Sequence, residues 1–165
     1  DEKELADIIY RYGEEKFSRR IAANIVKSRE KKPIETTFEL VDIIKASMPQ
    51  RAMRDSHPAR KTFQAIRIEV NAELDVLKST LEDAFEILAP GGRIAVITFH
   101  SLEDRIVKEQ FSKWCQGCTC PKEFPVCVCG NKPKGKSFKS ISPSKEELDE
   151  NPRARSSRLR IFEKF

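Results

Sequence analysis

Apolar side chains recur three or four residues apart through the first 50 residues, which is the spacing of amphipathic helices. The pattern predicts a helix over residues 2–12 and a second over about 14–31, with a glycine between them. Thr36 and Glu39 have the spacing of a capping box, so a third helix should begin there and end at Pro49. We therefore expect an all-helical region at the start of the chain.

The apolar period continues over residues 62–88, which predicts a long helical stretch with a bend near Asn71. A Pro-Gly-Gly turn then leads into residues 93–99, Arg-Ile-Ala-Val-Ile-Thr-Phe. This segment is β-branched and almost continuously apolar, which is typical of a strand covered on both faces. Ser101 and Asp104 are expected to cap the helix that follows.

Shorter elements are expected in the last third of the chain. The pattern predicts a strand over residues 138–142, a helix over 144–150 and a closing strand over 158–164. The order after the helical region is therefore helix, strand, helix, strand, strand, which indicates one edge of an α/β sheet. A sheet of two or three strands is small for an independent α/β domain, so we expect further strands on the N-terminal side of the complete protein.

The composition excludes several classes of protein. Of the 165 residues 39% are hydrophobic and 35% are charged, a balance typical of a globular protein. There is no apolar run of roughly 18 residues and no secretion signal, so we expect neither a membrane span nor export, and we predict a cytoplasmic protein. The net charge of +5 lies in residues 101–165, which carry 14 basic and 9 acidic groups. A basic face of this kind fits phosphate binding, although a solvated tail would carry the same charge.

Polar residues gather at the carboxyl end of the predicted strand, where open α/β sheets bind their ligands. Ser101 and Asp104 have structural explanations, as a helix cap and as a partner of the helix dipole. His100 and Arg105 have no such explanation in the sequence, and a helix N-terminus beside a cation suits a phosphate or a polar base edge.

A second polar stretch covers residues 56–74 and contains His57, Arg60, Arg67 and Asn71. The last three would lie near one face of a helix, and Arg forks and an Asn amide suit phosphates and base edges. Composition alone favours the plainer interpretation, a basic surface helix preceded by a loop histidine.

All five cysteines lie within 15 residues, from Cys115 to Cys129. Without a secretion signal, such a cluster indicates metal binding or reduced thiols more than disulfides. Two Cys-x-Cys pairs on a Pro-rich hairpin would close a tetrahedral thiolate site for structural zinc, with one thiol to spare. The alternative is a reduced loop that oxidises on handling. The candidate ligands are Cys115, Cys118, Cys120, Cys127 and Cys129.

Three blocks, residues 57–71, 91–105 and 151–160, resemble signature segments of the RsmH (MraW) family. The resemblance implies methylation of the exocyclic N4 of a cytosine in small-subunit (16S) ribosomal RNA by S-adenosyl-L-methionine. It also implies an α/β fold, a class I (Rossmann-like) methyltransferase sheet that carries an inserted all-helical domain for substrate recognition. Residues 1–70 would then be most of that insertion. Residues 71–165 would be the C-terminal part of the α/β domain, with a Cys-rich loop at 115–130.

The family's glycine-rich cofactor loop and its ribose-binding acidic residue have no counterpart in these 165 residues. We therefore interpret the chain as the substrate-side half of the enzyme, which alone should bind the cofactor poorly and not turn over. The cytosine amine is a weak nucleophile, so catalysis would depend mainly on positioning an unstacked base.

The expected partners are 16S rRNA in the small ribosomal subunit and S-adenosylmethionine, and a homodimer is a further expectation. The catalytic candidates are His100, Ser101 and Glu103. The candidates for RNA binding are Arg19, Arg20, Arg51, Arg54, His57, Arg60, Arg67, Asn71, Arg105, Arg153, Arg155 and Arg158. Two alternatives stay open: a non-catalytic basic RNA-binding or ribosome-associated module, and a methyltransferase that acts on DNA or another RNA base.

Overall fold

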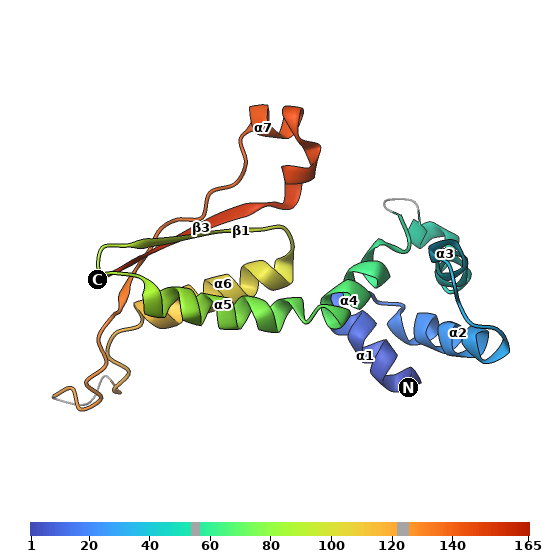
Figure 1. The fold of residues 1–165 in the computed structure, drawn as a ribbon, viewed down its shortest axis with the longest axis horizontal. Coiled ribbons are helices and arrows are strands. Elements are labelled where there is room, and N and C mark those ends of the chain that lie inside the picture. Colours follow the sequence, from blue (N-terminus) through green and yellow to red (C-terminus); the bar gives the residue numbers. More distant parts are fainter. Residues whose placement is uncertain (54–56, 122–125) are drawn as a thin grey trace. The chain divides into compact units, whose positions relative to one another are not determined.

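The structure, a computed structural model, describes residues 1–53, 57–121 and 126–165. The chain divides into two compact units, residues 1–73 and 74–165 (Figure 1). Each unit has its own hydrophobic core. In the described residues no helix has both the length and the apolar character that a membrane span requires.

The first unit is helical. Its elements are α1 (Glu2–Gly13), α2 (Ser18–Lys31), α3 (Thr37–Ala46), the 3-10 helix η1 (Gln50–Met53) and α4 (Arg60–Val70). Helix α1 packs against both α2 and α4. The fully buried side chains of Ile9, Ile21 and Ile44 meet in the core, which confirms the three apolar stripes that the sequence predicts. Helix α2 begins four residues later than expected, because Glu14 adopts a left-handed conformation with φ 49° and ends α1.

Local capping fixes the ends of these helices. The Thr36 hydroxyl accepts a hydrogen bond from the backbone amide of Glu39, and the Glu39 carboxylate accepts one from the backbone amide of Thr36, so the predicted capping box is confirmed. The predicted bend near Asn71 is a complete break, because Ala72 has φ 50° and separates α4 from α5 (Glu73–Ile87). Val70, which the sequence pattern places in the apolar stripe, is 77% exposed as a result.

The second unit is mixed α/β. After α5 come β1 (Arg93–Thr98), α6 (Ser101–Cys115), β2 (Gly135–Ser137), α7 (Lys145–Glu150), the 3-10 helix η2 (Pro152–Ser156) and β3 (Arg158–Lys164). The sheet has the order β1-β3-β2 with both pairs antiparallel. Strand β3 pairs with β1 from Arg93↔Glu163 to Thr98↔Arg158. The closing strand and the short helix α7, capped by Ser144, are where the sequence predicts them.

An aromatic cluster forms the core of this unit. Phe85 of α5, Phe111 and Trp114 of α6 and Phe162 of β3 lie with ring centroids 4.5 to 6.0 Å apart. Ile94 and Val96 of β1 pack against the cluster from the sheet. Helices α5 and α6 thus cover one face of the sheet (Figure 1).

Within the described residues of this chain, strand β1 is covered on one face, since Ala95 and Ile97 point to the opposite face and are exposed. One expectation about the strands is wrong. The strand expected over residues 138–142 is absent among the described residues: β2 precedes it, and Ile141 makes only an isolated bridge to Leu159. The reason is tertiary. Gly135 lies so close to Phe162 and to the Glu163 carbonyl that any larger side chain would collide with them, a contact that local propensity does not reveal.

Candidate functional site

The start of α6 is built around His100 and Glu103. His100 is the N-cap residue, and its Nδ1 accepts a hydrogen bond of 3.4 Å from the Glu103 amide. The Glu103 Oε2 atom in turn accepts from the amides of Phe99 at 2.8 Å and His100 at 3.2 Å. Glu103 Oε1 also lies 3.2 Å from His100 Nε2, but their alignment is not that of a hydrogen bond, and among the described residues Nε2 has no hydrogen-bonding partner. These two catalytic candidates are therefore in direct contact.

This geometry corrects the interpretation of the helix start. The sequence predicts Ser101 as the cap, whereas Ser101 is the first residue of α6 and His100 takes the capping position. Both His100-x-x-Glu103 and Ser101-x-x-Asp104 have capping-box spacing, and the preference of helices for Ser at the N-cap favours the wrong frame. His100 thus has a structural role that the sequence does not indicate, while Ser101 is exposed beside it.

Asp104 has a role beyond the helix dipole. Its carboxylate accepts two hydrogen bonds from Arg160, from Nε at 2.7 Å and from Nη2 at 2.8 Å. The buried Thr98 hydroxyl lies 3.3 Å from the same carboxylate and 3.4 Å from the Arg158 carbonyl. The hydrogen bonds and charge of Arg160 hold the pKa of Asp104 below its ordinary value of 3.8, although partial burial acts in the opposite direction. The Thr98 hydroxyl and the charge of Arg158 lower this pKa further. The ion pair joins the start of α6 to β3.

Thr98 and Arg160 were not among the candidates, although both lie in the signature blocks. The alternation of side chains between the two faces of β1 and β3 is the feature of the sequence that indicates them, because side chains two residues apart share one face of a strand. The remaining candidates of the second unit are exposed: Arg105 on α6, Arg153 and Arg155 on η2, and Arg158 on β3.

In the first unit, Arg67 and Asn71 converge on an acidic residue. Arg67 donates to both carboxylate oxygens of Glu73, at 2.7 and 3.0 Å, and the Asn71 amide donates to Glu73 at 3.1 Å. The sequence does not indicate Glu73 as a partner of Arg67. The two residues are six apart, which is not the spacing of a side-chain pair within one helix, and they meet because the helix breaks between them. An RNA phosphate would have to compete with Glu73 for these groups.

Other residues of the same signature block hold α4 in place. His57 Nδ1 accepts from the amide of Ala59 at 3.3 Å, just before α4 begins. Lys61 and Gln64 donate to the carbonyls of Glu14 and Tyr12 at the end of α1. Part of the block therefore serves the fold of the helical unit.

Four arginines present exposed positive charge in the first unit. They are Arg19 and Arg20 on α2, Arg51 on η1 and Arg60 on the first turn of α4. Over residues 1–53 and 57–121, these four side chains form no ion pair within 4.0 Å. Arg54, another candidate, lies outside the described residues.

The described residues do not fit a cofactor loop. Gly91 and Gly92 connect α5 to β1, and their backbones exchange hydrogen bonds with Lys164 at the end of β3, at 2.8 and 3.0 Å. The turn closes the β1–β3 pair and precedes its strand, so it lacks the strand-to-helix position of a cofactor-binding turn.

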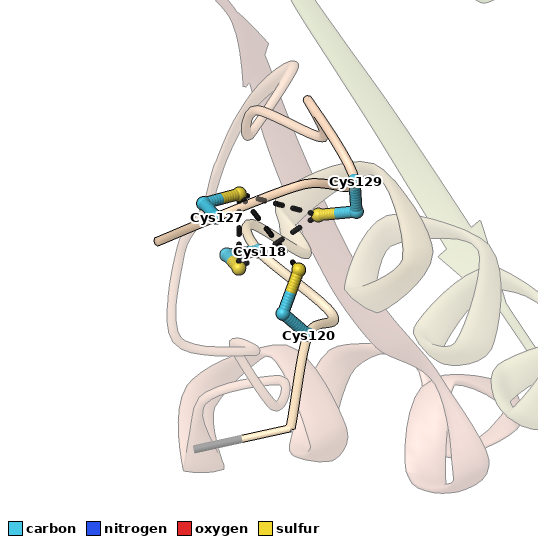
Figure 2. Close-up of side chains that lie close together, drawn as sticks. All are labelled: Cys118, Cys120, Cys127 and Cys129. Carbon is cyan, nitrogen blue, oxygen red and sulfur yellow. Dashed lines mark hydrogen bonds between the residues drawn. The ribbon is translucent and has the colours of Figure 1, made fainter. Parts of the chain in front are cut away.

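The cysteine loop brings four thiols together (Figure 2). The sulfur of Cys127 lies 3.3 Å from that of Cys118, 3.5 Å from that of Cys129 and 4.0 Å from that of Cys120. All four sulfur atoms lie within 4.8 Å of one another. The fifth thiol, Cys115, lies at the end of α6 and packs against the aromatic core, apart from the other four.

The pKa values of Cys118 and Cys129 are shifted in opposite directions. The backbone amides of Thr119 and Asn131 lower the pKa of Cys129 to about 5. For Cys118, the Cys120 amide acts in the same direction, but the neighbouring sulfurs of Cys127, Cys120 and Cys129 outweigh it and raise the pKa to about 11. The cluster therefore favours a thiolate at Cys129 at neutral pH.

A small antiparallel sheet edge covered by two helices, with polar side chains at the end of β1, is consistent with part of a class I methyltransferase fold. The model of the MraW methylase family matches residues 1–165, and the chain belongs to this family. The family resemblance of the three sequence blocks is thereby confirmed.

The curated relatives are ribosomal methyltransferases. The chain is 58% identical to the Ribosomal RNA small subunit methyltransferase H of Brevibacillus brevis, over 100% of the chain and 54% of that protein. It is 59% identical to the protein of the same name from Acetivibrio thermocellus, over 92% of the chain and 49% of the relative. It is 54% identical to the protein of that name from Ruminiclostridium cellulolyticum, over 99% of the chain and 53% of the relative. The chain thus spans about half the length of these relatives.

Proposed function

We propose that the complete protein, of which this chain supplies the substrate side, transfers a methyl group from S-adenosylmethionine to the exocyclic N4 of a cytosine in 16S rRNA. Membership of the MraW methylase family over the whole chain carries this proposal. Because the described residues do not fit the cofactor, its site would lie in the part of the relatives that this chain does not cover. In this reading residues 1–70 belong to the helical insertion and 71–165 to the α/β domain.

The end of β1 and the start of α6 would position the target base. The His100–Glu103 box and the Asp104–Arg160 pair fix this corner by hydrogen bonds between its own groups. A rigid corner suits the reaction, because attack by a weakly nucleophilic amine needs accurate placement more than a strong base. His100, Ser101 and Glu103 stay our candidates for contacts with the base.

The exposed arginines would bind RNA phosphates, which offsets the cost of unstacking the base. Arg60 is the sharpest test in the helical unit, since it is exposed and forms no ion pair among the residues described there. Arg60→Ala should weaken binding of a 16S rRNA fragment and reduce the slope of log affinity against log salt by about 1. Lys3→Ala, an exposed change on α1 outside the candidate set, is the matched control. Equal affinity and slope in both variants would remove Arg60 from the interface.

Methyl transfer to 16S rRNA lacking the modification tests the function itself. The complete protein, with S-adenosylmethionine labelled in the methyl group, should produce labelled N4-methylcytidine on nucleoside analysis. Binding of the rRNA without transfer would favour the non-catalytic RNA-binding module, and label in another nucleoside or in DNA would favour a different methyltransferase. Sedimentation of the same protein would test the expected homodimer, and cell fractionation would test the cytoplasmic location.

A further inference from the structure

We propose that Cys118, Cys120, Cys127 and Cys129 bind one Zn²⁺ ion as a structural four-thiolate site, which is a role beyond the proposed methyl transfer. In a tetrahedral site with Zn–S bonds of about 2.3 Å, neighbouring sulfurs lie about 3.8 Å apart. Four of the sulfur–sulfur separations in the cluster are 3.3, 3.5, 3.7 and 4.0 Å, and all lie within 4.8 Å. The sulfurs thus already surround a space of the size that zinc requires (Figure 2).

Burial of apolar side chains does not explain why the thiols converge. Cys118, Cys127 and Cys129 are exposed, and Val126 and Val128 between them are 70% and 75% exposed. A loop without an apolar core needs a cross-link to hold a fixed conformation, and a metal ion supplies one when the ligands come from both limbs of the loop. Here Cys118 and Cys120 come from the first limb and Cys127 and Cys129 from the second.

The backbone supports the cluster as it does in thiolate metal sites. The amide of Thr119 donates to the Cys129 sulfur at 3.4 Å, and the amide of Val128 donates to the Cys120 sulfur at 3.3 Å. Each bond runs from one limb to the other and would orient the sulfur lone pairs. At the base of the loop, the Asn131 side chain donates to the carbonyls of Gln116 and Gly117, at 3.2 and 2.7 Å.

A disulfide explains the arrangement less well. The Cys127 sulfur lies within 4.0 Å of three others, whereas a disulfide would select one partner. Zinc binding needs no oxidant: four thiols release four protons and donate four sulfur lone pairs to the ion. Because all four positions are taken by protein, the site has none open for substrate, and its role would be structural.

Metal analysis of the purified complete protein under reducing conditions tests the proposal. We expect about one zinc per chain, and about one equivalent of Co²⁺ should give the absorption bands of tetrahedral cobalt thiolate in the zinc-free protein. Cys129→Ser should reduce the zinc content and the cobalt absorption several-fold. Cys115→Ser is the matched control and should leave both unchanged, because this thiol lies outside the cluster.

Far-ultraviolet circular dichroism shows which variants fold, and the cobalt titration of the unmutated protein needs no variant. A reduced, folded protein that takes up neither metal would overturn the proposal. So would iron in place of zinc, or an equal loss of metal in Cys115→Ser and Cys129→Ser.

Discussion

The two ends of α6 obtain their order in different ways. At the N-terminal end, His100, Glu103 and Asp104 are held by backbone amides and by Arg160, and among the described residues His100 Nε2 is left without a hydrogen-bonding partner. Beyond the C-terminal end, the cysteine loop has exposed apolar residues and four converging sulfurs. The same helix thus carries, at one end, a polar corner held by hydrogen bonds between protein groups and, at the other, a loop whose order we attribute to a metal ion.

The difference shows what each end is suited to do. A corner whose hydrogen bonds are internal can present side chains to a substrate without rearranging. A loop that depends on a bound ion is ordered only when the ion is present, so its stability follows the supply of metal. Substitutions that separate the two ends can therefore test both assignments.

The largest effect is expected in the core that both ends share. Phe111 is 1% exposed and contacts Trp114 and Phe162, so Phe111→Ala should lower the free energy of unfolding by about 3–5 kcal/mol. Phe165→Ala, at a ring that is 63% exposed, should cost far less. Urea denaturation followed by circular dichroism measures both. Similar costs would contradict the placement of the core.

A smaller loss of stability is expected for a substitution that affects only the N-terminal end of α6. Asp104→Asn removes the carboxylate that accepts both hydrogen bonds of Arg160, and should cost about 1–2 kcal/mol for a partly exposed pair. Asp149→Asn on the exposed face of α7 is the matched control. The zinc content should stay unchanged in both variants. Loss of zinc in Asp104→Asn would show that the two ends are not independent.

The same pair predicts a dependence on pH. Because the folded pKa of Asp104 lies below 3.8, its contribution is fully present above that pH and is lost as the pH falls through the lowered folded value. The stability difference between the unmutated chain and Asp104→Asn should therefore shrink below pH 3.8. Denaturant midpoints measured down this range give the difference directly, and a difference that grew with acid would refute the ion pair.

Removal of the N-cap should have the smallest effect on stability. His100→Ala loses the acceptor for the Glu103 amide and should cost about 1 kcal/mol, whereas His100→Asn keeps a side-chain oxygen that can cap and should cost only a few tenths. Thermal unfolding of the two variants measures the contrast. Equal stability of Ala and Asn at this position would argue against the capping role.

The sequence predicted what depends on neighbours along the chain. The stripes of α1 to α3, the Thr36 cap and the cysteine pairs all follow from local spacing and were found. The position of β2 depends on Gly135 meeting Phe162, and the Arg67–Glu73 pair depends on the break at Ala72, neither of which local patterns reveal. The sequence does not reveal that His100 caps α6, because Ser101-x-x-Asp104 has the same capping-box spacing as His100-x-x-Glu103 and serine is the commoner N-cap residue. Spacing alone also does not distinguish Cys115, which packs on the core, from the four thiols that lie together in the loop.

Methyl transfer by the complete protein carrying His100→Asn tests the central claim most directly, namely that the corner at β1 and α6 positions the target cytosine. This change should preserve the helix cap, so a loss of activity would reflect the substrate and not the fold. We expect N4-methylcytidine formation in 16S rRNA to fall about tenfold or more at unchanged thermal stability, as for loss of a positioning contact. Formation at the unmutated rate would contradict the claim.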